Sequence, residues 1–342
     1  MKGYLDVSYK AFDIRACGYF KKGNPNTAKF GSIKIILEDL EKRNKNLTIR
    51  NTITYEPNSE RDELPVYCFD LRKIKDSKDY LLTLWNQTPT SNGKLATIKG
   101  DSKVGHADVS SSSIEEGAIP GFQTFFWIKP EKNKIISLRF ENIIGSDEMI
   151  KYIKGALHKY SRYRVTETNR NTGEVDIKGY REFTEDEIQK LAPKISIKAS
   201  RKKFKSEDIS KHYKNISKIV YKDCLSLQFE KEKKKGFFPQ IFRTNDLENA
   251  NRNFTYQCDY SFSKEKEVKD MIDEWEVKDD EAWKDLGFYD KSTRSTYFLS
   301  SAFVMNKDKA PIEYDSDGLI KPSKLAEFLQ RNDIKICNSL NI

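Results

Sequence analysis

The sequence contains two pairs of predicted strands, and a short turn with no helical pattern joins the strands of each pair. Val66–Leu71 and Tyr80–Trp85 are two apolar stretches joined by a short polar segment. Phe122–Ile128 and Lys134–Phe140 flank the turn sequence Pro130–Asn133 in the same way. Connections this short join antiparallel strands, because parallel strands need a crossover of about a dozen residues or more. The sequence therefore favours hairpins over βαβ units.

Helical patterns occur between the strand patterns at irregular intervals. Apolar residues from Ile33 to Leu40 recur at the i, i+3, i+4, i+7 spacing of one helix face, and Ser32 can cap that helix. Irregular alternation of helices and strands is typical of the α+β class. Further helices are predicted from Ser146 to about Tyr160, after Ser263, and from Pro322.

A chain of 342 residues is long for a single hydrophobic core. The polar stretch from Ser161 to Gly179 is a plausible boundary, because it follows a predicted helix. Thr88–Ser113 is rich in Ser, Thr, Gly and Asn, so we expect a long irregular loop there. We therefore expect an α+β protein with two domains, residues 1–161 and 162–342, each with antiparallel or mixed sheets and packed helices.

The positive charge of the chain is concentrated in one segment. Residues 151–235 contain 23 Lys and Arg against 12 Asp and Glu, which is a net charge of +11. The whole chain carries +9, so the remainder sums to −2. Clustered Lys and Arg with interleaved Phe and Tyr are typical of nucleic-acid-binding proteins. The same segment predicts phosphate contacts whose strength falls steeply with salt.

Within this segment, Ser206 is expected to begin a helix with Ile209, Ile216 and Val220 on its apolar face. The opposite face would carry lysines spaced three and four residues apart, up to Lys222. The segment shows no base-reading motif, which predicts sequence-independent binding of DNA. The residues expected to contact DNA are Lys198, Arg201, Lys202, Lys203, Lys205, Lys211, Lys214, Lys218, Lys231, Lys233, Lys234 and Lys235.

Four other interpretations of the charged segments remain open. The basic segment could be an ordinary solvated surface, or it could dock on an acidic protein or an anionic membrane. Asp223 with Glu232, Lys233 and Lys234 loosely matches the pattern of nucleases whose carboxylates hold Mg²⁺. The acidic segment Asp270–Asp285 could dock on the basic segment of a second copy, or cover it until nucleic acid displaces it.

No pattern in the sequence indicates a catalytic site, a metal site or a cofactor. The histidines, His106, His158 and His212, lack the spacing of metal ligands, and the five cysteines form no CxxC pair. No secretory signal follows Met1, and no apolar run reaches the roughly 18 residues of a membrane span. We therefore expect a cytoplasmic, non-enzymatic protein with reduced thiols.

Residues 113–126, together with the predicted hairpin and helix after them, resemble the RexA-like phage-exclusion (abortive infection) protein family. The family has a similar order of acidic residues, a turn with Gly and Pro, two strands and a helix. The resemblance implies a cytosolic DNA-binding protein of phage or prophage origin that acts in abortive infection. It also implies a clamp-like homodimer, similar to dimers of the RdgC type, and a membrane protein as the effector partner.

Overall fold

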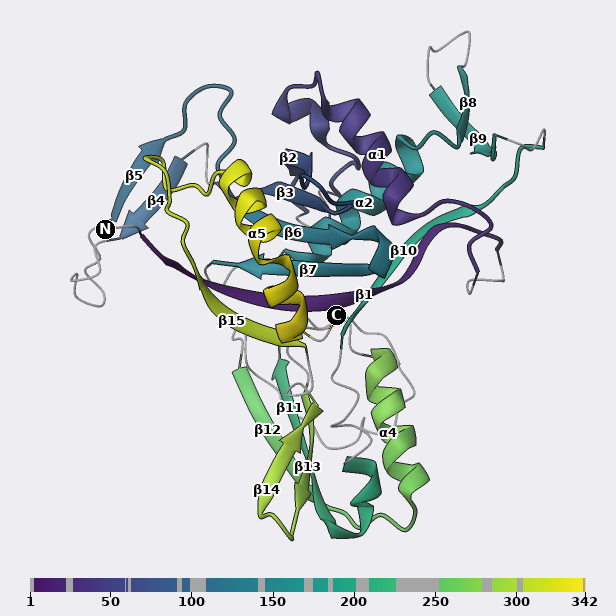
Figure 1. Cartoon of the computed structure of the whole chain (residues 1–342), viewed down its shortest axis with the longest axis vertical. Helices are drawn as coiled ribbons and strands as arrows, with labels where there is room; N and C mark the ends of the chain where they lie inside the picture. Colours follow the sequence, from purple (N-terminus) through teal and green to yellow (C-terminus); the bar gives the residue numbers. More distant parts are fainter. Residues whose placement is uncertain are drawn as a thin grey trace. The chain divides into compact units, whose positions relative to one another are not determined.

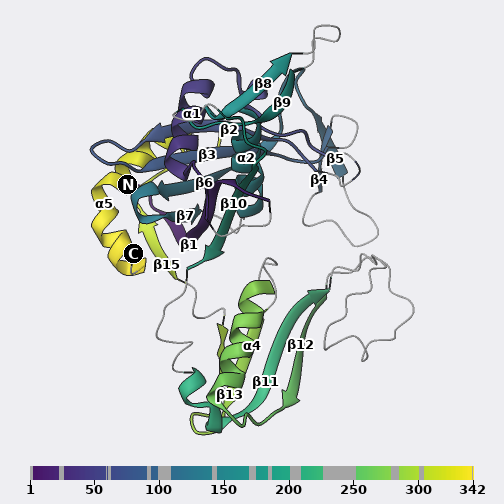
Figure 2. The same ribbon diagram turned by 90° about the vertical axis from the view of Figure 1, so that its right-hand side faces the viewer.

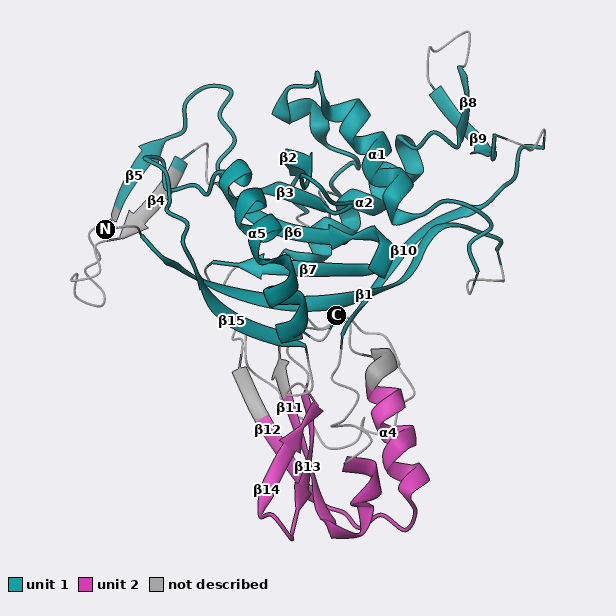
Figure 3. Ribbon diagram, in the orientation of Figure 1, with its two compact units in different colours: residues 1–200, 304–342 teal, residues 201–303 magenta. Residues whose placement is uncertain are grey.

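The computed structural model consists of helices and antiparallel sheets, which confirms the α+β class. The chain divides into two compact units (Figure 3). Unit 1 comprises residues 1–200 and 304–342, and unit 2 comprises residues 201–303. The residues that the structure describes are 3–22, 27–58, 60, 63–90, 94–98, 109–140, 145–168, 175–183, 187–200, 209–225, 252–278, 285–299, 304–340 and 342.

Unit 1 is built on an antiparallel sheet with the strand order β10-β1-β7-β6-β3-β2, in which β15 also pairs with β1 (Figure 1). Two separate hairpins, β4–β5 and β8–β9, extend from it. The strands of unit 1 are β1 (Leu5–Phe20), β2 (Val66–Lys73), β3 (Tyr80–Gln87), β4 (Lys94–Ile98), β5 (Val109–Ser113), β6 (Gly121–Lys129), β7 (Lys134–Arg139), β8 (Arg164–Thr168), β9 (Val175–Tyr180), β10 (Ala192–Ala199) and β15 (Met305–Ala310). Its helices are α1 (Ile33–Asn44), α2 (Ser146–Lys159) and α5 (Pro322–Leu340), with the short 3-10 turns η1 (Ile49–Thr52) and η3 (Pro130–Lys132).

Both faces of this sheet are covered by helices. Successive side chains of a strand point to opposite faces, and β6 shows the result. Phe126 and Ile128 pack in the cluster that α1 and α2 complete, while Phe125 and Trp127 pack in the cluster that α5 completes. Unit 1 therefore has three layers, with its two apolar cores on either side of the sheet.

Unit 2 is inserted into unit 1 between Ser200 and Val304, and both of these residues lie beside the 16-residue strand β1. Ala11, in the middle of β1, donates its N–H to the carbonyl of Val304 at 3.0 Å and accepts from the N–H of Ser200 at 2.8 Å. The N–H of Val304 in turn donates to the carbonyl of Ser200 at 2.8 Å. The chain therefore leaves and re-enters unit 1 at two residues that hydrogen-bond to each other.

The predicted boundary after residue 161 does not coincide with this division. The chain returns from α2 through β8 and β9 into the core of unit 1, where Tyr163 and Tyr180 are buried beside Tyr19. The ring of Tyr19 lies 5.7 Å from that of Tyr163 and 4.4 Å from that of Tyr180. Polar composition between 161 and 179 therefore marks an exposed hairpin rather than a linker, because its ends carry core aromatics.

Unit 2 is a four-stranded antiparallel sheet, in the order β12-β11-β13-β14, with α4 packed on one face (Figure 2). Val268, Ile272 and Trp275 of α4 form its core with Leu286 and Phe288 of β13. This core is separate from the two cores of unit 1. The elements of unit 2 are η4 (Tyr213–Asn215), β11 (Ile216–Leu225), β12 (Arg252–Asp259), α4 (Glu265–Lys278), β13 (Asp285–Asp290) and β14 (Ser295–Phe298).

The helix predicted from Ser206 to Lys222 is wrong from His212 onwards. Residues 209–211 form a short helical turn, η4 follows, and β11 begins at Ile216. The segment from Ile216 to Tyr221 is rich in β-branched and aromatic residues, which pack well in a strand. Strand β11 is bonded on both sides, to β12 and to β13, and this pairing overrides the helical spacing of its apolar residues.

Other predicted elements are confirmed. Ser32 caps α1 by accepting a hydrogen bond from the N–H of Ile35, and β6 and β7 form the predicted hairpin. The loop expected at Thr88–Ser113 is wrong in part, because β4 and β5 pair within it. No helix among the described residues is both long enough and apolar enough to cross a lipid bilayer.

Candidate nucleic-acid interface

The predicted DNA-binding residues do not form one helical strip. Lys198 lies on β10 in unit 1, opposite Asp13 of β1. Lys211, Lys214 and Lys218 lie in unit 2, at or before the start of β11. Only part of the predicted set can therefore be placed within one unit. The remaining predicted residues, Arg201, Lys202, Lys203, Lys205, Lys231, Lys233, Lys234 and Lys235, lie outside the described residues.

Two lysines of β11 lie on the face of the unit 2 sheet that α4 does not cover. Ile219 and Tyr221 pack against the core that α4 completes. Because side chains alternate along a strand, Lys218 and Lys222 project from the opposite face. Lys222 is exposed and Lys218 is half-buried. A separation of four residues places two side chains on one face of a helix, and it also places them on one face of a strand.

Aromatic rings lie beneath both lysines. The Nζ atom of Lys222 is 3.8 Å from the centre of the Phe298 ring, and that of Lys218 is 5.9 Å from the Tyr289 ring. Phe298 of β14 lies across Gly287 of β13, where an added Cβ would come within 2.7 Å of the ring. Each exposed cation–π contact contributes about 0.5–1 kcal/mol. These contacts hold the two ammonium groups over the open face.

Carboxylates accompany the same lysines. The Nζ atom of Lys218 is 3.8 Å from a carboxylate oxygen of Asp259, whose side chain is 88% exposed. Asp285 of β13 lies opposite Lys222 in the strand register. An exposed ion pair of this kind contributes little to stability and is easily replaced by another anion. Lys218 and Lys222 thus face two carboxylates, and the charge excess of the chain comes from elsewhere.

More exposed cations gather at the end of unit 2 where β11 begins. The N–H of Lys291 donates to the carbonyl of Asn215 at 2.9 Å, which brings the β13–β14 turn beside η4. Lys214, Lys291 and Arg294 are all exposed there. Sequence reasoning missed Lys291 and Arg294 because they lie outside the basic segment. Only the contact between η4 and this turn reveals them.

The carboxylate of Asp290 accepts hydrogen bonds within that turn. Its Oδ1 atom accepts from the backbone N–H of Ser292 at 2.7 Å and from the Ser292 hydroxyl at 2.6 Å. Burial opposes ionisation, but these hydrogen bonds hold the pKa of Asp290 below its usual value. Asp290 therefore fixes the turn that presents Lys291 and Arg294.

The acidic helix α4 does not cover Lys218 and Lys222. It packs on the opposite face of the sheet, and its acids Asp270, Asp273 and Glu274 are exposed. At its first turn, Lys269 and more weakly Lys211 lower the pKa of Glu265. Glu265 lies before the predicted acidic segment Asp270–Asp285, so the covering of the basic segment and the docking on a second copy both stay predictions.

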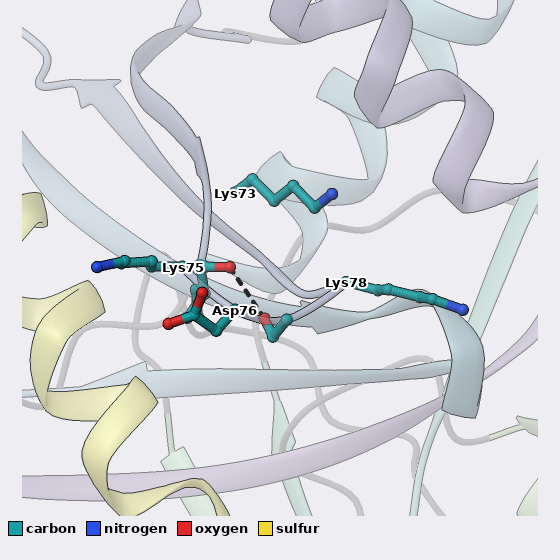
Figure 4. Close-up of a pocket in the computed structure, with 6 residues that line it drawn as sticks. Lys73, Lys75, Asp76 and Lys78 are labelled. Atoms are coloured by element: carbon teal, nitrogen blue, oxygen red, sulfur yellow. Dashed lines mark hydrogen bonds between the residues drawn. The ribbon is translucent and has the colours of Figure 1, made fainter.

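A second group of lysines lies in unit 1, on the turn between β2 and β3. A shallow hollow of about 440 Å³ is lined by residues 73–78. Lys73, Lys75 and Lys78 are exposed, and Lys75 points away from the other two (Figure 4). Ammonium groups that diverge in this way do not converge on one anion. These lysines carry the same charge as those of the unit 2 face without gathering on one surface.

The nuclease interpretation finds no support in the described residues. Among them, no group of three His, Cys, Asp or Glu side chains is placed to hold a metal ion. Asp223 lies in β11 opposite Phe254, whereas Glu232, Lys233 and Lys234 lie outside the described residues. The acidic pattern therefore stays a prediction that cleavage assays can test.

Comparison with models of protein families, with curated proteins and with solved structures finds no match to this chain. The RexA-like resemblance of residues 113–126 therefore stays a prediction. The α+β class, by contrast, follows from the observed helices and antiparallel sheets.

Proposed function

We propose that this protein binds DNA without sequence specificity through unit 2. The observation that carries the proposal is the open sheet face with Lys218 and Lys222, each held over an aromatic ring. Lys218 and Lys222 belong to residues 151–235, the segment with a net charge of +11, although Asp259 and Asp285 lie beside them on this face. The exposed Lys214, Lys291 and Arg294 extend the cationic surface at one end of the sheet.

The geometry suits contacts with a phosphate backbone. Lys218 and Lys222 are four residues apart, which is about 13 Å along a strand. Phosphates of one strand of duplex DNA recur about every 3.4 Å along the helix axis, so the two lysines can reach phosphates of the same strand. Such contacts position the protein but do not read bases.

The test is a gel-shift titration on duplex and single-stranded DNA at about 50 and 200 mM salt. The variant Lys218→Glu/Lys222→Glu should weaken binding at least about tenfold and flatten its salt dependence, since two phosphate contacts become repulsive. A second variant reverses Arg201, Lys202 and Lys203 together with Lys205, and it should abolish retention of DNA.

The matched control is Lys75→Glu/Lys78→Glu, which makes the same charge change on the unit 1 turn of Figure 4. It should bind DNA nearly as well as the parent protein. Circular dichroism and thermal unfolding establish that every variant is folded. If the folded unit 2 variants bind like the parent, or if the control loses binding equally, the proposal fails.

The biological role follows from the resemblance and belongs to the same proposal. We place the protein in the cytoplasm as the homodimeric, clamp-like sensor of a phage-exclusion system with a membrane protein as effector. Sedimentation with and without DNA tests the dimer. Mg²⁺-dependent cleavage in the gel-shift lanes would instead indicate the nuclease. Binding to anionic vesicles without binding to DNA would indicate the interaction protein.

A further inference from the structure

A cavity of about 280 Å³ lies in unit 1, where β6 and β7 separate. Pairing between these strands ends at Phe125 and Leu138, although β6 continues to Gly121 in its pairing with β3. The segment that precedes α5 contributes Tyr314 and Leu319 to the lining. The cavity is thus formed by chain segments that are distant in the sequence.

One cation in the wall of the cavity is not compensated. The Nε atom of Arg139 is buried and has no hydrogen-bond partner among the described residues. Burial alone lowers the pKa of the Arg139 guanidinium, with no carboxylate acting against it. Guanidinium groups in proteins are usually paired when they lose water, because an unpaired buried charge is costly.

The remaining wall combines polar side chains with aromatic rings, and a polar clamp holds part of it in place. Phe125 and Phe140 pack edge to face, with ring centres 5.5 Å apart. The amide of Gln123 accepts from the N–H of Ile320 at 2.9 Å and donates to the carbonyl of Ile320 at 3.2 Å. This bidentate contact fixes the segment before α5 against β6. The exposed Asp317 is the carboxylate that lines the cavity among the described residues.

We propose that this cavity binds a small molecule that carries an oxyanion on an apolar or aromatic body, with the oxyanion paired to Arg139. Planar guanidinium groups bind carboxylates and phosphates through parallel hydrogen bonds, and such charge-assisted bonds are strong where water is excluded. The aromatic side chains receive the body of the ligand. The volume lies just below the usual range for ligand pockets, which restricts the ligand to a small molecule.

The test uses phenyl phosphate and phenylacetate as probes, with calorimetric titration and thermal unfolding of the full chain. Inorganic phosphate measures the contribution of the anion alone, and benzyl alcohol measures that of the ring alone. We expect one of the two aromatic anions to bind and to raise the melting temperature, with benzyl alcohol inactive at the same concentration. Which of the two binds identifies the headgroup as phosphate or carboxylate.

The variant Arg139→Met should lose this binding without losing stability. Its melting temperature should equal or exceed that of the parent protein, because an unpaired and partly buried charge has been removed. Arg139→Lys keeps the charge without the planar fork, so its affinity should fall at least about tenfold. The exposed Arg331 supplies the control variant Arg331→Met, which should bind like the parent.

Three results would overturn the proposal. The first is that neither aromatic anion binds the parent protein at millimolar concentration. The second is that Arg139→Met and Arg139→Lys bind as tightly as the parent, which would place the probe elsewhere. A fall of several degrees in the melting temperature of both unliganded variants would assign Arg139 a structural role and would also contradict the proposal. Binding of DNA by unit 2 is measured separately and does not affect these outcomes.

Discussion

At the scale of single residues, the buried lysine of β6 shows how unit 1 is held together. The side chain of Lys129 is 4% exposed and donates to Asp79, at the start of β3, and to Asp333 of α5 at 2.9 Å. Trp127 donates its indole N–H to Asp79 at 3.1 Å. Burial opposes the charge, but the hydrogen bonds to both carboxylates raise the pKa of Lys129. This cluster joins α5 to the sheet.

We expect Lys129→Met to destabilise unit 1 by about 3–5 kcal/mol, because it leaves Asp79 as an uncompensated buried charge. Urea unfolding monitored by circular dichroism measures the loss. Lys335→Met is the control, since Lys335 pairs with Asp308 at 2.6 Å but is itself 66% exposed. It should cost about 1 kcal/mol or less. Equal losses in the two variants would contradict the expectation.

Sequence patterns could not reveal this cluster. Lys129 is separated from Asp79 by 50 residues and from Asp333 by 204. The local sequence around each of the three residues is typical of a surface charge. Only the packing of α5 on the sheet brings Lys129, Asp79 and Asp333 together. Sequence patterns could not reveal the state of Arg139 either. Its Nε atom has no hydrogen-bond partner among the described residues because of how the fold surrounds it, not because of the sequence of β7.

At the scale of helices and strands, predictions were accurate where one local pattern decided the outcome. The apolar positions of α1 and the start of α5 at Pro322 are confirmed, because each helix presents one apolar face to the sheet. For β11 two patterns competed. Ile216, Ile219 and Val220 fit a helix by spacing, but they also fit a strand by their β-branched side chains. Pairing with β12 and β13 decided between them.

The strand assignment of β11 predicts a cross-strand disulfide. Lys222 lies opposite Thr255 of β12. The N–H of Tyr260 donates to the carbonyl of Ser217, and alternation from that bonded position makes Lys222 and Thr255 a non-hydrogen-bonded pair. Cα atoms in such pairs are about 4.5 Å apart, within the range of a disulfide. Lys222→Cys/Thr255→Cys should therefore oxidise readily, as mass spectrometry after thiol blocking can show.

The control moves one cysteine by a single residue. Lys222→Cys/Tyr256→Cys places the two side chains on opposite faces of the sheet, so it should remain reduced. The parent protein supplies the background from its own cysteines. If the offset pair forms the disulfide and the aligned pair does not, the register of β11 and β12 is shifted by one residue.

At the scale of the whole chain, no sequence pattern indicated that unit 1 is discontinuous. Domain boundaries are predicted from polar linkers, but unit 2 is inserted where β10 and β15 both pair with β1. The discontinuity could be recognised only from the pairing of β15 with β1 and the packing of α5 on the same sheet. No local pattern carries that information, since strand partners here lie far apart in the sequence.

The insertion predicts that unit 1 folds without unit 2. The N–H of Val304 and the carbonyl of Ser200 are 2.8 Å apart, so a Gly-Ser-Gly linker can replace residues 201–303 without strain. Both cores of unit 1 stay complete as far as the structure describes them, because none of their described residues belongs to the deleted segment. The shortened protein should unfold cooperatively in urea. It should also retain the phenyl phosphate or phenylacetate site at Arg139 and lose binding to DNA.

A shortened protein that is folded and still binds DNA as tightly as the full chain would place the interface in unit 1. One that cannot fold would show that β1 needs unit 2 to hold β10 and β15 along a single edge.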